Sequence, residues 1–182
     1  SILSKVSAMH DAWSIVDSVF RLRCLLDKTP NLKKKSPGLS LFFRQTTEVG
    51  NLRNVVQHLD TEMQTIIDLN IAAWGSLTWA TIIDAEKHLI RSCLIVPGTL
   101  ISGSNTILNP LGRDFHSQVD YITLHASRFT LCLSEVMRSV EQLIKRFEKS
   151  LESQTEALPK ATGDYLCSID IIGNPSKPAK SR

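Results

Sequence analysis

The residues best suited to chemistry in this chain lie within the six-residue stretch RNVVQH at positions 53–58. Arg53 offers a permanent cation that binds phosphate through a planar set of donors. The ordinary pKa of a histidine side chain is about 6.5, so a residue of this type, here His58, can accept or donate a proton close to neutral pH. Asn54 adds an amide that can orient either the bound phosphate or the imidazole of His58. The stretch therefore predicts a site that binds a phosphate group and moves a proton beside it.

These residues fall in the middle of an amphipathic pattern that predicts one long helix over residues 40–68. Apolar side chains recur there at near-heptad spacing, namely Phe42, Val49, Leu52, Val56, Leu59, Met63 and Ile66. The opposite side of the helical wheel is small and uncharged, with Thr47, Gly50, Asn51, Asn54, His58, Thr61 and Thr65. A solvated helix face normally carries Lys and Glu, so this composition indicates a cleft or the close approach of another helix. Gln57 and Thr61 are further candidates for contact with a substrate.

The other elements are predicted from the same kind of pattern. Apolar residues at helical spacing predict helices over residues 2–27 and 134–154. Residues 72–133 are rich in β-branched and aromatic residues and predict a hairpin of 74–83 and 88–96, followed by short strands at 119–125 and 129–133. The fold class expected is therefore α+β, mainly α with a β insertion.

One domain is expected over residues 1–158, with a partly flexible C-terminal extension over 159–182 in which 165–172 is a candidate edge strand. The expected sheet is small and antiparallel, and it comes between the second and third long helices in the chain.

The motif from Arg53 and Asn54 to His58 resembles the R-N-x-x-x-H signature of the HEPN superfamily, on the kind of helix where that family carries it. The resemblance implies a HEPN-like antiparallel helical bundle that forms a homodimer, with two copies of the motif meeting across the dimer cleft. It also implies a metal-independent endoribonuclease in prokaryotic defence or a toxin–antitoxin pair. An antitoxin or another defence protein is then an expected partner.

The resemblance also implies a role for each motif residue. His58 would take a proton from a ribose 2′-hydroxyl or return one to the leaving oxygen, and Arg53 would stabilise charge on the phosphate. Asn54 would orient the phosphate or the imidazole. No metal and no cofactor are expected, and the substrate must be RNA because the 2′-hydroxyl is the nucleophile. His10 and Asp11 are candidates for the polar partner that HEPN sites often take from a neighbouring helix.

Other interpretations of the same residues remain open. In one, Arg53 pairs with a nearby carboxylate such as Asp60 or Glu48, while Asn54 and His58 satisfy hydrogen bonds between helices. In another, a non-catalytic dimeric module binds RNA, a nucleotide or a protein through the same cleft. A third is a purely structural α+β domain within a larger assembly.

Composition limits the remaining possibilities. The formal net charge is only +3, so an RNA contact must be local, and the only dense basic run is Lys33, Lys34 and Lys35 in a loop. The four cysteines, Cys24, Cys93, Cys132 and Cys167, have no zinc-site spacing, and free thiols are expected. His88, His116 and His125 are scattered, which favours structural or exposed roles. No secretory signal or bilayer-spanning run is found, so a cytoplasmic protein without membrane contact is expected.

Overall fold

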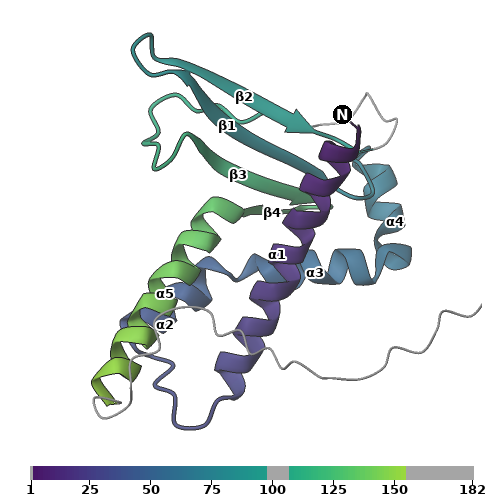
Figure 1. The fold of residues 1–182 in the computed structure, drawn as a ribbon. Coiled ribbons are helices and arrows are strands. Elements are labelled where there is room, and N and C mark those ends of the chain that lie inside the picture. The colour runs from purple at the N-terminus through teal and green to yellow at the C-terminus, as the bar shows by residue number, and fades with distance from the viewer. Residues whose placement is uncertain (1, 98–106, 155–182) are drawn as a thin grey trace, which may run out of the picture.

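The computed structural model describes residues 2–97 and 107–154 (Figure 1). Within them the chain forms five helices and four strands in the order α1 (Ile2–Lys28), α2 (Pro37–Gln45), α3 (Glu48–Gln57), α4 (Leu59–Asp68), β1 (Ser76–Asp84), β2 (Leu89–Ile95), β3 (Val119–Ala126), β4 (Phe129–Cys132) and α5 (Leu133–Gln154). The predicted α+β class is confirmed, and the sheet lies between α4 and α5 in the sequence. The predicted extension over 159–182 and the candidate strand at 165–172 lie outside the described residues.

The strands form one antiparallel sheet in the order β2-β1-β3-β4, which confirms the predicted hairpin and the two later strands. Leu77, Leu124 and Leu131 are aligned across β1, β3 and β4, and all three are buried in the core. Their neighbours along the strands are mostly threonine, serine and histidine. This alternation places an apolar face of the sheet against the helices.

The core is centred on α3, which contacts α1 on one side and β4 on another. Val49, Leu52 and Val55 of this helix are almost completely buried, and Phe42 of α2 packs into the same cluster. α5 closes the core by packing on α2 and on β3. Figure 1 shows α3 lying across α1 and α5 rather than alongside them. The position of α3 fixes where residues 53–58 lie.

The prediction of a single helix over 40–68 is wrong, because the chain breaks first between α2 and α3. The hydroxyl of Thr46 donates to the carbonyl of Phe42 at 2.6 Å, and Thr47 donates to the carbonyl of Arg44 at 2.9 Å. Arg23 of α1 also donates to the carbonyl of Phe43 at 2.7 Å. Hydroxyl and guanidinium donors thus satisfy the carbonyls at the end of α2 and allow the helix to stop there.

A second break falls at His58, whose backbone has φ −123° and ψ 44°. The N–H of His58 still donates to the carbonyl of Asn54 at 2.9 Å, while its own carbonyl accepts from the N–H of Thr61 at 3.0 Å. The residue therefore ends α3 and begins α4 without leaving backbone groups unpaired. Beyond the break the predicted apolar seam is only partly covered, because Ile66 is buried and Met63 is 40% exposed.

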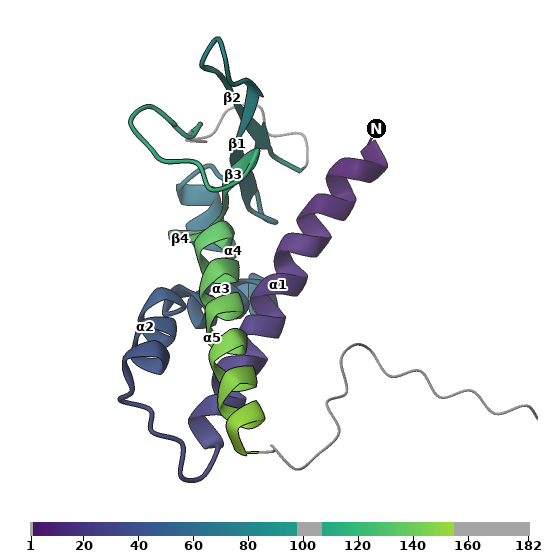
Figure 2. The same cartoon turned by 60° about the vertical axis from the view of Figure 1, so that its left-hand side comes forward.

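The long helices α1 and α5 agree with the sequence prediction to within one residue at each end. A view turned by 60° shows α1 and α5 approaching each other below the sheet and diverging toward it, with the N-terminal end of α1 at the level of the sheet and α2 on the far side of α5 (Figure 2). Within the described part of the chain, none of the helices has the length and apolar content needed to cross a bilayer.

Candidate functional site

Arg53 leaves α3 on the side that faces α1 and is held there by two contacts. Its Nε donates to Oδ1 of Asp17 at 3.0 Å, and its guanidinium carbon lies 4.4 Å from the centre of the Phe20 ring. The side chain is 26% exposed, so part of the guanidinium still faces solvent. A planar cation stacked on an aromatic ring and paired through one edge is well ordered and keeps other donors for a ligand.

Asp17 holds two arginines at once. Its Oδ2 lies 2.7 Å from Nε of Arg21, one turn further along α1, and its Oδ1 pairs with Arg53. The hydrogen bond from Arg53, together with the charge of Arg21, lowers the pKa of the Asp17 carboxyl below its ordinary value. The three side chains carry a net charge of about +1 near neutral pH, because the arginines stay protonated. The cluster is therefore a local cationic site in a chain of low net charge.

A surface groove of ≈520 Å³ between α1 and α3 contains this cluster. His10 and Gln57 also line it, together with Trp13 and Val56. His10, Asp17 and Arg21 follow one another at spacings of seven and four residues, which places them on one face of α1. The groove combines cationic, amide and imidazole groups over a partly apolar floor, as a site for a phosphate attached to an organic group requires.

Asn54 and His58 lie beside this groove but do not line it. Both side chains are exposed, Asn54 on the outer surface of α3 and His58 at the break between α3 and α4. Successive residues of a helix turn by about 100°, so His58 projects about 140° away from Arg53 around α3. Thr61 is also exposed, and its hydroxyl donates to the carbonyl of His58 at 2.8 Å. A single chain therefore does not bring Arg53 and His58 to one reacting atom.

The remaining sequence-predicted residues are separated by the fold. Nδ1 of His10 and Oδ1 of Asp11 are 3.7 Å apart at the surface, yet Asp11 lines a different groove, between α1 and α5. Lys33, Lys34 and Lys35 lie in the loop beyond the C-terminal end of α1, where Lys34 pairs with Asp27 at 2.8 Å. The rise of a helix is about 1.5 Å per residue, so this loop begins about 17 Å beyond Asp17 along α1. The lysines do not share the groove of Arg53.

The alternative in which Arg53 pairs with a carboxylate is confirmed, but the carboxylate is not one of those predicted. The predicted partners were Glu48 and Asp60, but Glu48 instead accepts from Asn51 at 3.0 Å, and the carboxylate that holds Arg53 is Asp17. Sequence reasoning missed Asp17, Phe20 and Arg21. The available signal was the placement of His10, Asp17 and Arg21 on one face of the first predicted helix.

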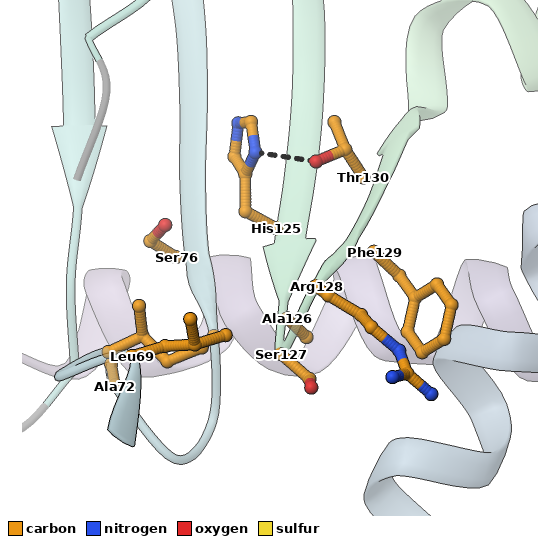
Figure 3. A pocket seen from close by; sticks show the side chains of 11 residues that line it. Leu69, Ala72, Ser76, His125, Ala126, Ser127, Arg128, Phe129 and Thr130 are labelled. Atoms are coloured by element: carbon orange, nitrogen blue, oxygen red, sulfur yellow. Dashed lines mark hydrogen bonds between the residues drawn. The ribbon is translucent and has the colours of Figure 1, made fainter. Parts of the chain in front are cut away.

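A second cavity, of ≈230 Å³, lies at the turn between β3 and β4 (Figure 3). His125 lies at its edge, with Nδ1 3.1 Å from the hydroxyl of Thr130 and Nε2 3.1 Å from the hydroxyl of Thr78. Burial lowers the pKa of His125 below the ordinary value for histidine. Both ring nitrogens are engaged by hydroxyl groups of the neighbouring strands, so His125 joins three strands and the imidazole has a structural role.

Among the described residues there is no group of three or more His, Cys, Asp or Glu side chains arranged to hold a metal ion. Cys24, Cys93 and Cys132 are free thiols in separate parts of the fold. No protein-family model, no curated protein and no solved structure matches the chain. The groove and the motif are therefore the features that bear on its function.

Proposed function

We propose that this protein is a HEPN-type, metal-independent endoribonuclease that cleaves RNA at a site shared by two copies of the chain. Its helices would then have a HEPN-like arrangement. The observation that carries the proposal is the position of Arg53, held by Asp17 and Phe20 at the edge of a cationic groove, five residues before the exposed His58. Arg53 and His58 are the two ends of the motif, and both keep polar groups at the surface.

The orientation of His58 supports the need for a second copy. Arg53 and His58 of one chain point in different directions, whereas a two-fold axis near α3 would bring each His58 toward the other chain. Two-fold symmetric contacts are the commonest way in which identical chains associate. In such a pair, His58 of both copies would face one scissile phosphate, and Arg53 and Asn54 would reach its non-bridging oxygens from the edges of the two grooves. His10, Arg21 and Gln57 would bind the flanking nucleotides.

The chemistry assigned to the residues conserves atoms and charge. One His58 removes the proton of a ribose 2′-hydroxyl, whose oxygen attacks the adjacent phosphorus and forms a 2′,3′-cyclic phosphate. The bond from phosphorus to the 5′-oxygen breaks, and the second, protonated His58 supplies the proton of the new 5′-hydroxyl. The guanidinium of Arg53 stabilises the negative charge that accumulates on the non-bridging oxygens in the transition state. Asn54 donates to one of these oxygens or orients the imidazole.

The test is cleavage of a pool of single-stranded and structured RNA by the purified chain in EDTA, followed by end-group analysis. Products with cyclic phosphate and 5′-hydroxyl ends are expected, and the activity should elute from a size-exclusion column together with a dimer of the protein. A DNA pool of the same sequences should remain intact because it lacks the 2′-hydroxyl. Cleavage that requires a divalent metal, or that elutes apart from the protein, would exclude the proposal.

A second candidate function is a dimeric RNA-binding module without cleavage. The observation that favours it is the ion pair between Arg53 and Asp17. Asp17 already neutralises part of the charge with which Arg53 would stabilise a transition state. In this case the wild-type chain should bind the RNA pool while leaving it intact. Arg53→Ala should then weaken binding, which distinguishes this candidate from a purely structural domain.

Asp17→Asn is expected to strengthen RNA binding and to weaken cleavage. The substitution removes the negative charge beside two guanidinium groups, so they become more available to phosphates, but Arg53 loses the charged partner that orients it. Exposed ion pairs are worth about 0–1 kcal/mol, so affinity should rise by up to about fivefold. The affinity is measured with a 2′-O-methyl oligonucleotide, which cannot be cleaved by this chemistry, and cleavage is measured with the unmodified RNA. A fall in affinity would show that Asp17 does not compete with the ligand.

A further inference from the structure

A second groove lies on the other side of α1, with α5 as its opposite wall (Figure 2). It consists of two adjoining cavities, of ≈590 and ≈320 Å³, which share Ile15 and Met137. Ala12 and Leu22 of α1 and Val140 of α5 add to its apolar lining. Met137 is 38% exposed. Charged side chains, among them Asp11, Arg138 and Glu141, also line the larger cavity. The two helices thus leave a largely apolar surface with charged neighbours uncovered in the angle between them.

The dimensions of the groove are those of a short extended peptide. From Ala8 to Leu22 it follows about 21 Å of α1, from a helical rise of about 1.5 Å per residue. A strand advances about 3.3 Å per residue, so about six residues cover this length. Alternate side chains of a strand point to opposite sides, so a peptide with apolar residues at every second position would present a wholly apolar side to the groove.

The chain itself supplies such a peptide beyond α5. Residues 165–172 read YLCSIDII, and in a strand Tyr165, Cys167, Ile169 and Ile171 would all lie on one side. This side is entirely apolar, whereas the alternate positions include Ser168 and Asp170. The sequence of 165–172 therefore has the alternation that the groove requires.

The connection between α5 and this peptide is long enough to reach the groove. Met137 precedes Gln154, the last residue of α5, by about 26 Å along the helix axis. The linker over residues 155–164 can cover about 33 Å when extended. The peptide can thus return along α5 toward the sheet and pass between the two helices.

We propose that the groove between α1 and α5 is the docking site of the chain's own 165–172 segment, with its apolar side against Ile15 and Met137. Docking would cover the apolar lining of both helices. It would also brace α1, the helix that carries Asp17 and Arg21 on its other side. This proposal is independent of any catalytic activity of the protein.

Disulfide trapping in the full-length chain tests the proposal, with the native Cys167 as one partner. Met137→Cys places a thiol on the α5 wall of the groove, and Ser18→Cys places one on the α1 wall. Gln142→Cys is the matched control, because it is exposed on the same helix and faces away from Met137 by about 140°. After brief oxidation, peptide mapping by mass spectrometry identifies the disulfides that contain Cys167.

Both groove thiols should couple to Cys167 at least about tenfold faster than the control, because docking raises the local concentration of the segment. Adding Ile169→Asp to the Met137→Cys chain should reduce the rate to that of the control. Mixing chains labelled with ¹⁴N and ¹⁵N shows whether the docked segment comes from the same chain or from a second copy. Equal rates for groove and control thiols, no effect of Ile169→Asp, or disulfides formed only between chains would each overturn the proposal.

Discussion

His58→Ala is expected to slow RNA cleavage by about 10²–10⁴-fold, the range typical for removal of a general acid or base. Each shared site would lose both the group that removes the 2′-proton and the group that protonates the 5′-oxygen. Folding should be unaffected, because the imidazole is exposed and the hydrogen bonds at the helix break use the backbone of His58. Initial cleavage rates in EDTA and urea-induced unfolding, measured on the same preparations, check both expectations.

His116→Ala is the matched control for this substitution. His116 is also exposed, and its contribution to the fold is a backbone N–H, which alanine retains. The control should cleave RNA at the wild-type rate. If His58→Ala cleaves as fast as His116→Ala, the imidazole of His58 takes no part in the reaction. If His58→Ala unfolds at a lower urea concentration than the wild type, the residue has a structural role.

Asp120→Ala is expected to lower the free energy of unfolding by about 3–5 kcal/mol, as breaking a buried ion pair does. The Asp120 side chain is 0% exposed and accepts hydrogen bonds from Arg138 at 2.9 Å, the N–H of Tyr121 at 2.7 Å and the N–H of His116 at 3.0 Å. Tyr121 has φ 56° at a bulge in the pairing of β1 with β3. The carboxylate therefore holds a strained turn of the sheet as well as Arg138.

Urea titration measures the loss, and Asp114→Ala is the matched control. Asp114 is an exposed carboxylate before the same strand, so its removal should change the stability by less than about 0.5 kcal/mol. A similar small effect of Asp120→Ala would show that the network around Asp120 contributes little.

The contribution of Asp120 should also depend on pH. Burial by itself raises the pKa of this carboxyl, but the N–H of His116, the guanidinium of Arg138 and the N–H of Tyr121 together lower it to about 2. The ordinary value is 3.8, so the stabilisation is complete above about pH 4 and is lost as the pH falls toward 2. The difference in stability between the wild type and Asp120→Asn should therefore narrow below pH 4. A difference that stays constant from pH 7 to pH 2.5 would contradict this expectation.

The elements that sequence reasoning predicted well are those whose signal is local. α1 and α5 carry apolar residues at helical spacing, and the strands of the β1–β2 hairpin are rich in β-branched and aromatic residues with a polar turn between them. The helix over 40–68 was predicted as one element because its apolar period continues through both breaks. The first break has a local signal in the hydroxyls of Thr46 and Thr47, but it also depends on Arg23, which comes from another helix and has no local pattern.

The difference between local signals and contacts from distant parts of the chain also explains which residues of the candidate site were predicted. Arg53, Asn54 and His58 were found from their types and spacing, which are local properties of the sequence. The partner of Arg53 lies 36 residues earlier in the chain, and it could be identified only after the crossing of α1 and α3 was known. The division of His10 and Asp11 between two grooves has the same cause, because adjacent residues of a helix point about 100° apart.

The central position of α3 has a consequence for how the chain folds during synthesis. Val49, Leu52 and Val55 belong to α3, which packs on α1, made before it, and on β4, made much later, while α2 packs on α5. Contacts that join distant parts of a sequence form slowly, since a long loop must close before any of them is gained. A nascent chain that ends before α5 leaves the side of α2 that packs on α5 in contact with water. The core around Arg53 can therefore form only after about residue 143 has left the ribosome, when Leu143 and the rest of the cluster are present.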